Sequence, residues 1–263
     1  MIHIKTNLCD GHIPAVHTKI EDEKRHPCIN TPSYLVKREL TDITEPVLAG
    51  LGLKYKYSIS DIHDNIDPPF HVNNANDGRG LNGQRQCFSL DDQEIVKKYL
   101  DETLKRKDKI NIVEIGVNRY DFKTTDDKFE TTSTSIFLRN KRDADIYLGI
   151  DIDDKSFLND RNKNIYTIAT PSQEIEKVYR YMDSIGFGKI DILMIDGFHS
   201  INQVYKEWEY TARLTDTGIV IFHDTNAHPG PYFLLESIDY DKYDVYKYFN
   251  DIVDYGVGVL VKK

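Results

Sequence analysis

The segment IDILMIDGFHS, residues 190 to 200, ends an apolar run with two groups that can do chemistry. Asp196 and His199 stand three residues apart just before a helix start. A carboxylate is a ligand for hard divalent ions, and an imidazole can accept a proton near neutral pH. A second apolar run, TGIVIFHD, ends in His223 and Asp224. These residues predict a site at the ends of buried strands.

Alternating strand-like and helix-like segments, from about residue 90 onward, must position these groups. Short connections between such segments are typical of a parallel sheet with helices on both faces. Helices are predicted at 89–107, from Ser133, and at 200–214, where Ser200 and Gln203 form a capping box. The predicted parallel strands are 110–116, 146–153, 164–169, 190–196 and 217–224.

The C-terminal residues 243–263 do not continue the alternation of strands and helices. YDVYKYFN (243–250) and YGVGVLVKK (255–263) are joined by too few residues for a parallel crossover, so they should pair as an antiparallel hairpin. The predicted fold class is α/β: a Rossmann-like doubly wound sheet of five parallel strands plus this hairpin. We expect this α/β domain to occupy residues 89–263.

Residues 1–88 are rich in Asn, Asp, Gly and Pro and should be largely loop, with short helices at 35–51. We interpret this region as a lid or substrate-side extension, because long loops in compact domains usually bind or cover something. A flexible tail or an oligomerisation arm is the structural alternative. Tyr55, Tyr57, His63 and His71 could line a sugar or phenol pocket, although scattered aromatic residues more often pack or lie on the surface.

The composition of the 263 residues, 40% hydrophobic and 29% charged, is typical of a soluble globular protein. No apolar run reaches the roughly 20 residues of a membrane span, and the N-terminus has no apolar signal core. The three widely spaced cysteines suggest neither disulfides nor zinc, so a cytoplasmic protein is expected. The formal charge of -9 disfavours nucleic acid as a partner.

Ligands of open α/β sheets bind at the carboxyl ends of the strands, beside the topological switch point. Glu114 and Gly116 end the first predicted strand, Asp151 ends the second, and Ser172 follows the third. An acid at the end of the second strand suits hydrogen bonding to the hydroxyls of a ribose. A solvated strand end with a cap is the structural alternative for Asp151.

Four motifs, VEIGV, GIDID, MIDGFHSINQVYKEWEY and TGIVIFHD, closed by the hairpin ending YGVGVLVKK, resemble the class I S-adenosylmethionine-dependent methyltransferases. The similarity is greatest to the group with Asp-Gly-x-His-Ser after the fourth strand and His-Asp after the fifth, akin to macrocin-type O-methyltransferases and cephalosporin-hydroxylase-like proteins. It covers roughly residues 90–263. It implies a seven-stranded sheet and S-adenosylmethionine as the cofactor.

The resemblance also implies roles for single residues. Glu114 and Gly116 would hold the methionine part of the cofactor, and Asp151 would bind the ribose hydroxyls. Ser172 lies near the adenine position, where the usual acid is missing.

Three further residues, Asp196, His223 and Asp224, match the positions that bind a divalent ion in metal-dependent relatives, which points to Mg²⁺ or another divalent cation. His199 occupies the offset of the base that deprotonates the acceptor hydroxyl. Alternatively, His199 caps the following helix and His223 orients Asp224.

The sequence departs from the family after Gly116. Residues 117–132 intervene before Ser133 without a second glycine, so they either fold over the cofactor or mark a degenerated cofactor site. The predicted function is divalent-metal-assisted O-methylation of a small-molecule or sugar hydroxyl; homo-oligomerisation stays open. A binding or assembly module that retains the fold is the second hypothesis. A nicotinamide oxidoreductase is disfavoured, because the first strand lacks GxGxxG.

Overall fold

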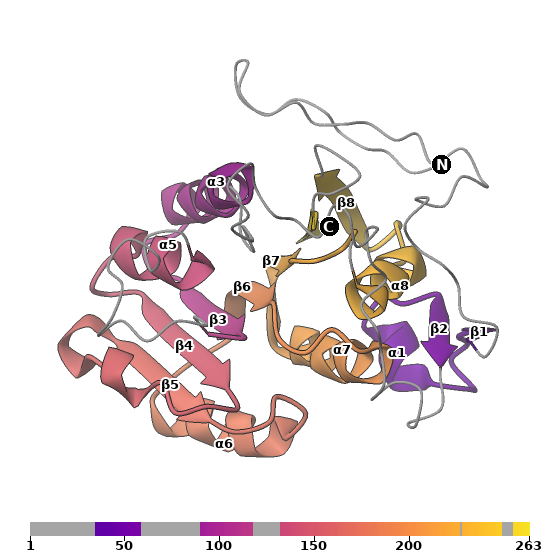
Figure 1. Cartoon of the computed structure of the whole chain (residues 1–263), viewed down its shortest axis with the longest axis horizontal. Coiled ribbons are helices and arrows are strands. Elements are labelled where there is room, and N and C mark those ends of the chain that lie inside the picture. Colours follow the sequence, from indigo (N-terminus) through magenta and orange to yellow (C-terminus); the bar gives the residue numbers. More distant parts are fainter. Residues whose placement is uncertain (1–34, 59–89, 118–131, 227, 249–254) are drawn as a thin grey trace, which may run out of the picture. The chain divides into compact units, whose positions relative to one another are not determined.

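The structure is a computed structural model that describes residues 35–58, 90–117, 132–226, 228–248 and 255–263 (Figure 1). His63, His71, most of the predicted extension and nearly all of the segment between Gly116 and Ser133 lie outside the described residues. The chain divides into two compact units, each considered by itself. The sheet unit comprises residues 88–198 and 209–221, and the hairpin unit comprises residues 1–87, 199–208 and 222–263.

Seven strands form one sheet in the order β5-β4-β3-β6-β7-β9-β8. The pairs β3–β4, β3–β6 and β4–β5 are parallel, and β8–β9 is antiparallel. The order reverses at β3, which has β4 on one side and β6 on the other. The predicted Rossmann-like sheet with a terminal hairpin is therefore confirmed, in the strand order of the class I methyltransferase type. The strands are β3 (Asn111–Ile115), β4 (Ile146–Asp151), β5 (Ile165–Ala169), β6 (Ile190–Ile195), β7 (Leu214–Phe222), β8 (Tyr243–Tyr248) and β9 (Val257–Lys262).

Both helices predicted within the sheet unit are present: the one at 89–107 is α3 and the one from Ser133 is α5, whereas α6 was not among the predicted helices. In α3 the side chains of Ile95, Tyr99 and Leu100 are buried along one face, and α5 begins after Thr132, whose hydroxyl accepts the N–H of Ser135 at 3.2 Å. In Figure 1, α3 and α5 lie on one side of strands β3 to β5 and α6 lies on the other. The helical elements of the sheet unit are α3 (Leu90–Arg106), α5 (Ser133–Asn140), η2 (Ser156–Leu158), η3 (Arg161–Lys163), α6 (Ile175–Ser184) and most of η4 (Trp208–Arg213).

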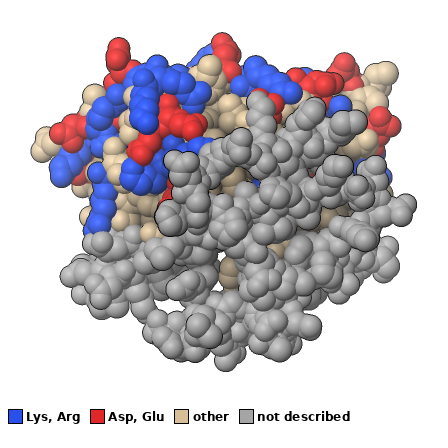
Figure 2. Space-filling model, turned by 90° about the horizontal axis from the view of Figure 1, so that it is seen from above, with Lys and Arg blue, Asp and Glu red and all other residues tan. Residues whose placement is uncertain are grey.

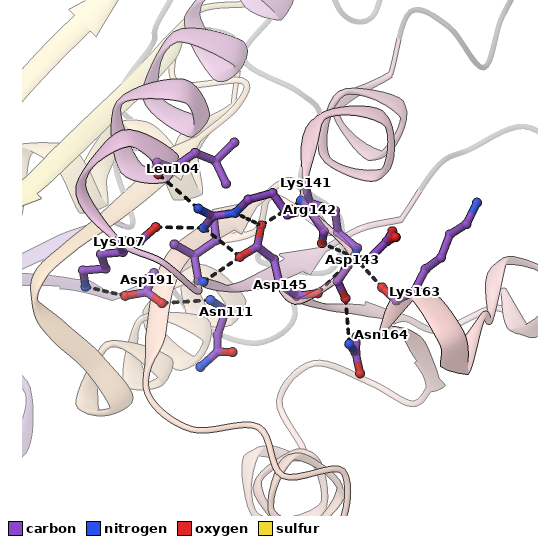
Figure 3. Close-up of polar contacts among 11 residues, drawn as sticks. Leu104, Lys107, Asn111, Lys141, Arg142, Asp143, Asp145, Lys163, Asn164 and Asp191 are labelled. Atoms are coloured by element: carbon purple, nitrogen blue, oxygen red, sulfur yellow. Dashed lines mark hydrogen bonds and ion pairs between the residues drawn. The ribbon is translucent and has the colours of Figure 1, made fainter.

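A polar network fastens the amino ends of the strands in the sheet unit (Figure 3). Asp191 of β6 accepts the main-chain N–H of Asn111 at 2.8 Å and the ammonium of Lys107 at 2.5 Å. The fully buried Asp145, just before β4, accepts the main-chain N–H of Arg142 at 2.8 Å and its guanidinium at 2.9 Å. Buried carboxylates satisfied in this way stabilise the sheet and leave its carboxyl ends for ligands.

The hairpin unit carries the remaining elements, namely β1 (Val36–Glu39), α1 (Pro46–Gly50), β2 (Tyr55–Ser58), α7 (Ile201–Glu207), α8 (Pro229–Ser237), β8 and β9. β1 and β2 pair antiparallel as a separate two-stranded sheet. The expectation of loop with short helices is correct for α1 and wrong for these two strands. Tyr57 packs on Phe233, with ring centroids 4.6 Å apart, and its N–H donates to the hydroxyl of Tyr205, so tertiary contacts fix the extended chain.

The helix predicted at 200–214 is also shorter than expected. Ser200 caps α7 by accepting the N–H of Gln203, but α7 ends at Glu207 and the tighter 3-10 helix η4 follows. Tyr210 is fully buried, and its hydroxyl donates to the carbonyl of Ser172 at 2.7 Å. This contact, and not the α-helical period, sets the path of the chain before β7.

The described surface on the face seen in Figure 2 carries acidic and basic side chains side by side. Within the described ranges, no helix combines the length and the apolar character of a membrane span.

Candidate functional site

The carboxyl end of β3 turns sharply at Gly116. Its φ is +84°, a conformation that side chains other than glycine rarely adopt, and its N–H donates to the carbonyl of Ile150 at 3.0 Å. A Cβ at this position would lie 2.0 Å from the carbonyl oxygen of Asp196. The turn therefore requires glycine even before a cofactor is considered.

Asp151, the last residue of β4, reaches this turn. Its Oδ2 accepts the N–H of Val117 at 2.8 Å, and its Oδ1 accepts the N–H of Asp153 at 2.9 Å. The two contacts fix the half-buried carboxylate, and each oxygen retains a second lone pair that can accept a ligand hydroxyl. The strand-end cap is thus real, and binding of a ribose stays a prediction compatible with it.

Glu114 is fully buried, and its carboxyl group accepts hydrogen bonds from side chains of the same unit. Its Oε1 accepts the hydroxyl of Ser133 at 2.5 Å, and its Oε2 accepts the hydroxyls of Thr134, at 2.9 Å, and of Tyr147. Burial raises the pKa of Glu114 to about 7, although the three hydrogen bonds act in the opposite direction. Its observed contacts fasten the start of α5 to β3, and a contact with the methionine part of a cofactor stays a prediction.

Two further predicted residues lie in the sheet unit. Ser172 is buried shortly after β5 and accepts the hydroxyl of Tyr210 with its carbonyl. Asp196 is half-buried after β6, and its N–H donates to the carbonyl of Ile115 at 2.9 Å. His223 and Asp224 belong to the hairpin unit, so the metal site of Asp196, His223 and Asp224 stays a prediction.

The hairpin unit gathers a cluster of His199, His223, Asp224 and His228, called the histidine cluster below. Asp224 Oδ2 lies 2.6 Å from His199 Nε2 and 3.9 Å from His228 Nε2, whereas Asp224 Oδ1 lies 3.2 Å from His223 Nδ1. The rings of His199 and His228 lie with their centroids 4.7 Å apart. Three imidazoles thus surround one carboxylate, and the structure brings together three of the predicted residues.

Main-chain hydrogen bonds at the start of α8 hold this cluster. The N–H of His228 donates to the carbonyl of Asp224, and the N–H of Gly230 donates to the carbonyl of His199, both at 3.0 Å. Glycine is needed at residue 230, because a Cβ there would lie 2.4 Å from the carbonyl oxygen of His199. The first turn of α8 therefore fixes the separation of both partners of the His199–Asp224 pair.

Asp224 itself has an unusual backbone. Its φ of +59° is left-handed, which costs a residue other than glycine about 1–3 kcal/mol and is frequent at functional sites. Burial alone would raise the pKa of Asp224, but the imidazoles of His223 and His199 outweigh it and hold this pKa well below its usual range. The carboxylate is therefore ionised and available as a hydrogen-bond acceptor or metal ligand.

His228 is the cluster member that sequence reasoning missed. It stands four residues after Asp224 and directly before Pro229, the first residue of α8. A proline at the first helical position is a recognisable helix start, so the His-Pro pair could have placed this imidazole close to Asp224. The segment lacks any familiar metal-binding spacing.

Similarity to known proteins is limited to the fold of the main chain. No protein-family model matches the sequence, and no curated protein matches it. A MycE methyltransferase from the mycinamycin biosynthetic pathway, in complex with Mg and SAH, is similar over 66% of this chain and 51% of its own, with 16% identity and a TM-score of 0.48. The chain thus spans about half the length of that protein.

Two other solved structures are similar at the same level. CalS11, a TDP-rhamnose 3'-O-methyltransferase of calicheamicin biosynthesis, has 13% identity and a TM-score of 0.46 over 65% of this chain and 78% of its own. The N-methyltransferase NodS from Bradyrhizobium japonicum has 11% identity and a TM-score of 0.44 over 72% of this chain and 95% of its own. Such values do not identify an activity or a substrate.

Proposed function

We propose that this chain is an S-adenosylmethionine-dependent methyltransferase. The observation that carries the proposal is the position of Asp151, whose carboxylate is fixed at the end of β4 against the turn at Gly116. That turn follows β3, at which the strand order reverses. An acid beside a glycine turn at the switch point is where open α/β sheets bind the ribose of nucleotide-containing cofactors.

We further propose O-methylation of a small-molecule hydroxyl, such as that of a sugar or phenol. The support is the resemblance together with the pairing of His199 and Asp224 at 2.6 Å, which orients an imidazole as a general base. Direct displacement of a methyl group gains most from positioning and from deprotonation of the acceptor. Ser172 would lie near the adenine, and Glu114 and Gly116 near the methionine part.

A divalent ion is the remaining part of the proposal. Asp196, His223 and Asp224 would hold it, because two carboxylates and an imidazole form a donor set that Mg²⁺ or Mn²⁺ accepts. When bound, the ion would lower the pKa of the acceptor hydroxyl. Removal of metal with a chelator should then abolish turnover while cofactor binding persists.

Isothermal calorimetry of the full chain with S-adenosylmethionine and S-adenosylhomocysteine tests the proposal. Asp151→Ala should weaken binding at least about tenfold, because hydrogen bonds to a charged group contribute roughly 1.5–3 kcal/mol each. Asp153→Asn is the matched control, since it alters a neighbouring exposed carboxylate. Absence of binding by the wild type at millimolar cofactor would refute the proposal.

A binding or assembly module with the same fold is the second candidate. The observation that favours it is Glu114, whose carboxyl group accepts three hydrogen bonds from within the unit. This candidate predicts a folded protein with no calorimetric response to either cofactor, so the same experiment separates the two functions.

A further inference from the structure

We propose that His199, Asp224 and His228 form a site for a first-row transition-metal dication such as Zn²⁺ or Co²⁺. This ligand set differs from the predicted set of Asp196, His223 and Asp224, and it includes an imidazole that the sequence did not suggest. One ligand atom from each of the three residues lies within 4.8 Å of the others. All three residues belong to the hairpin unit.

The donor chemistry selects the class of metal. Two imidazoles and one carboxylate suit Zn²⁺, Fe²⁺, Co²⁺ or Ni²⁺, whereas Mg²⁺ prefers oxygen ligands and retains several waters. Catalytic zinc sites use three protein ligands of this kind and leave a fourth position open. The cluster therefore favours a transition metal over Mg²⁺.

The distances fit with small side-chain movements. Ligand bonds of about 2.1 Å place neighbouring ligand atoms roughly 3.0–3.4 Å apart in octahedral or tetrahedral sites. The atom Asp224 Oδ2 lies 2.6 Å from His199 Nε2 and 3.9 Å from His228 Nε2, values that bracket this range. The side chains of His199, Asp224 and His228 are 12%, 11% and 21% exposed, so each keeps part of its surface accessible to solvent.

Supporting contacts resemble those around established metal ligands. His223 Nδ1 lies 3.2 Å from Asp224 Oδ1 and orients the carboxylate so that Oδ2 faces the other two imidazoles. The hydrogen bonds at the start of α8 hold the main chains of His199, Asp224 and His228 together. The left-handed backbone of Asp224 is a strained feature that the surrounding contacts maintain.

A bound ion would change the chemistry of the cluster. It would take the Nε2 lone pair of His199 and leave the ring proton on Nδ1, so that neither ring nitrogen could accept a proton. Under the proposed function, on which this consequence alone rests, the ion would inhibit methyl transfer by withholding the base. Metal binding itself does not depend on the proposed function.

Titration of the metal-depleted full chain with Co²⁺ tests the site, because the visible absorption of Co²⁺ reports its coordination. We expect one Co²⁺ per chain, displaced by Zn²⁺ and not by a large excess of Mg²⁺. A flat visible spectrum at millimolar Co²⁺, or displacement by Mg²⁺ as readily as by Zn²⁺, would overturn the inference. Calorimetry of the same protein with S-adenosylmethionine measures cofactor binding and so tests the proposed function independently of the metal site.

Variants of His228 show whether it is a ligand. His228→Ala should weaken Co²⁺ binding more than about 100-fold, since loss of even an outer-shell partner costs roughly 10–100-fold. Tyr232→Phe, one turn further along α8, is the matched control and should bind as the wild type does.

His228→Cys keeps a ligand at this position. This variant should gain a sulfur-to-cobalt charge-transfer band. The wild type, although it has three cysteines, is expected to lack that band. This gain keeps the inference testable if the Ala variant folds poorly. Unchanged affinity of His228→Ala, or a Cys variant that binds Co²⁺ without the new band, would overturn the assignment.

Discussion

Gly116 lies against the main chain of Asp196 so closely that no side chain fits between them. A Cβ on residue 116 would be 2.0 Å from the Asp196 carbonyl oxygen, and the residue has a φ of +84°. The neighbouring N–H of Asp196 donates to the carbonyl of Ile115 at 2.9 Å. The pairing of β3 with β6 therefore requires the glycine that the family resemblance reserves for the cofactor.

Replacement of Gly116 by Ala should lower the free energy of unfolding by roughly 2–5 kcal/mol, the sum of left-handed strain and overpacking. Gly186→Ala separates the two causes, because Gly186 has a φ of +67° with nothing within 4 Å of the added Cβ. It should cost only about 1–2 kcal/mol. Urea denaturation measures both, and equal losses would show that the clash is relieved without cost.

Substitution of Glu114 by Gln should change how stability depends on pH. Burial raises the pKa of Glu114 from 4.5 to about 7, so folding favours its protonated form. The stability gained from protonation is complete below about pH 4.5 and is lost as the pH rises to about 7, by a total of roughly 3 kcal/mol. The wild type should show this decline relative to Glu114→Gln, which cannot ionise; parallel curves would contradict the shift.

Truncation of the Tyr205 hydroxyl should destabilise the hairpin unit. This hydroxyl accepts the N–H of Tyr57 at 3.0 Å and is bonded to the Ser237 hydroxyl at 2.5 Å. Tyr205→Phe should cost about 1–3 kcal/mol, because a buried donor loses its partner. Tyr166→Phe, on a half-exposed tyrosine of β5, should change the free energy of unfolding by less than about 0.5 kcal/mol.

His199→Gln should leave the affinity for S-adenosylmethionine intact and lower turnover by about 10²–10⁴-fold, the usual contribution of a general base. Transfer of a labelled methyl group to sugars, phenols and polyketide glycosides supplies the assay. Turnover equal to that of the wild type would assign His199 a structural role at the start of α7.

The core of the fold could be predicted because buried parallel strands are continuous apolar runs. β4 and β6 follow this rule, and the close spacing of β8 and β9 dictates their hairpin. The strand β2 could not be predicted, because Tyr57 owes its extended conformation to Phe233 and Tyr205, far away in sequence. The 3-10 turn at Tyr210 has the same kind of cause.

The candidate site was predicted where strand ends deliver the residues. Asp151 ends β4, Gly116 directly follows β3, and His223 and Asp224 follow β7, so their approximate positions come from the strand pattern. His228 escaped notice because its place depends on the main-chain hydrogen bond from its N–H to Asp224. Contacts of Glu114 with Ser133 and Tyr147 are likewise invisible in a linear pattern.

The reversal of strand order at β3 also constrains how the chain is made. Ile112 of β3 pairs with Ile192 of β6, which is 80 positions later (192 − 112). A ribosome adding about 5–20 residues per second needs roughly 4–16 s to deliver that partner. During this interval β3 can gain only β4 as a neighbour, and its other edge, with unpaired main-chain groups, must be kept from pairing with another nascent chain.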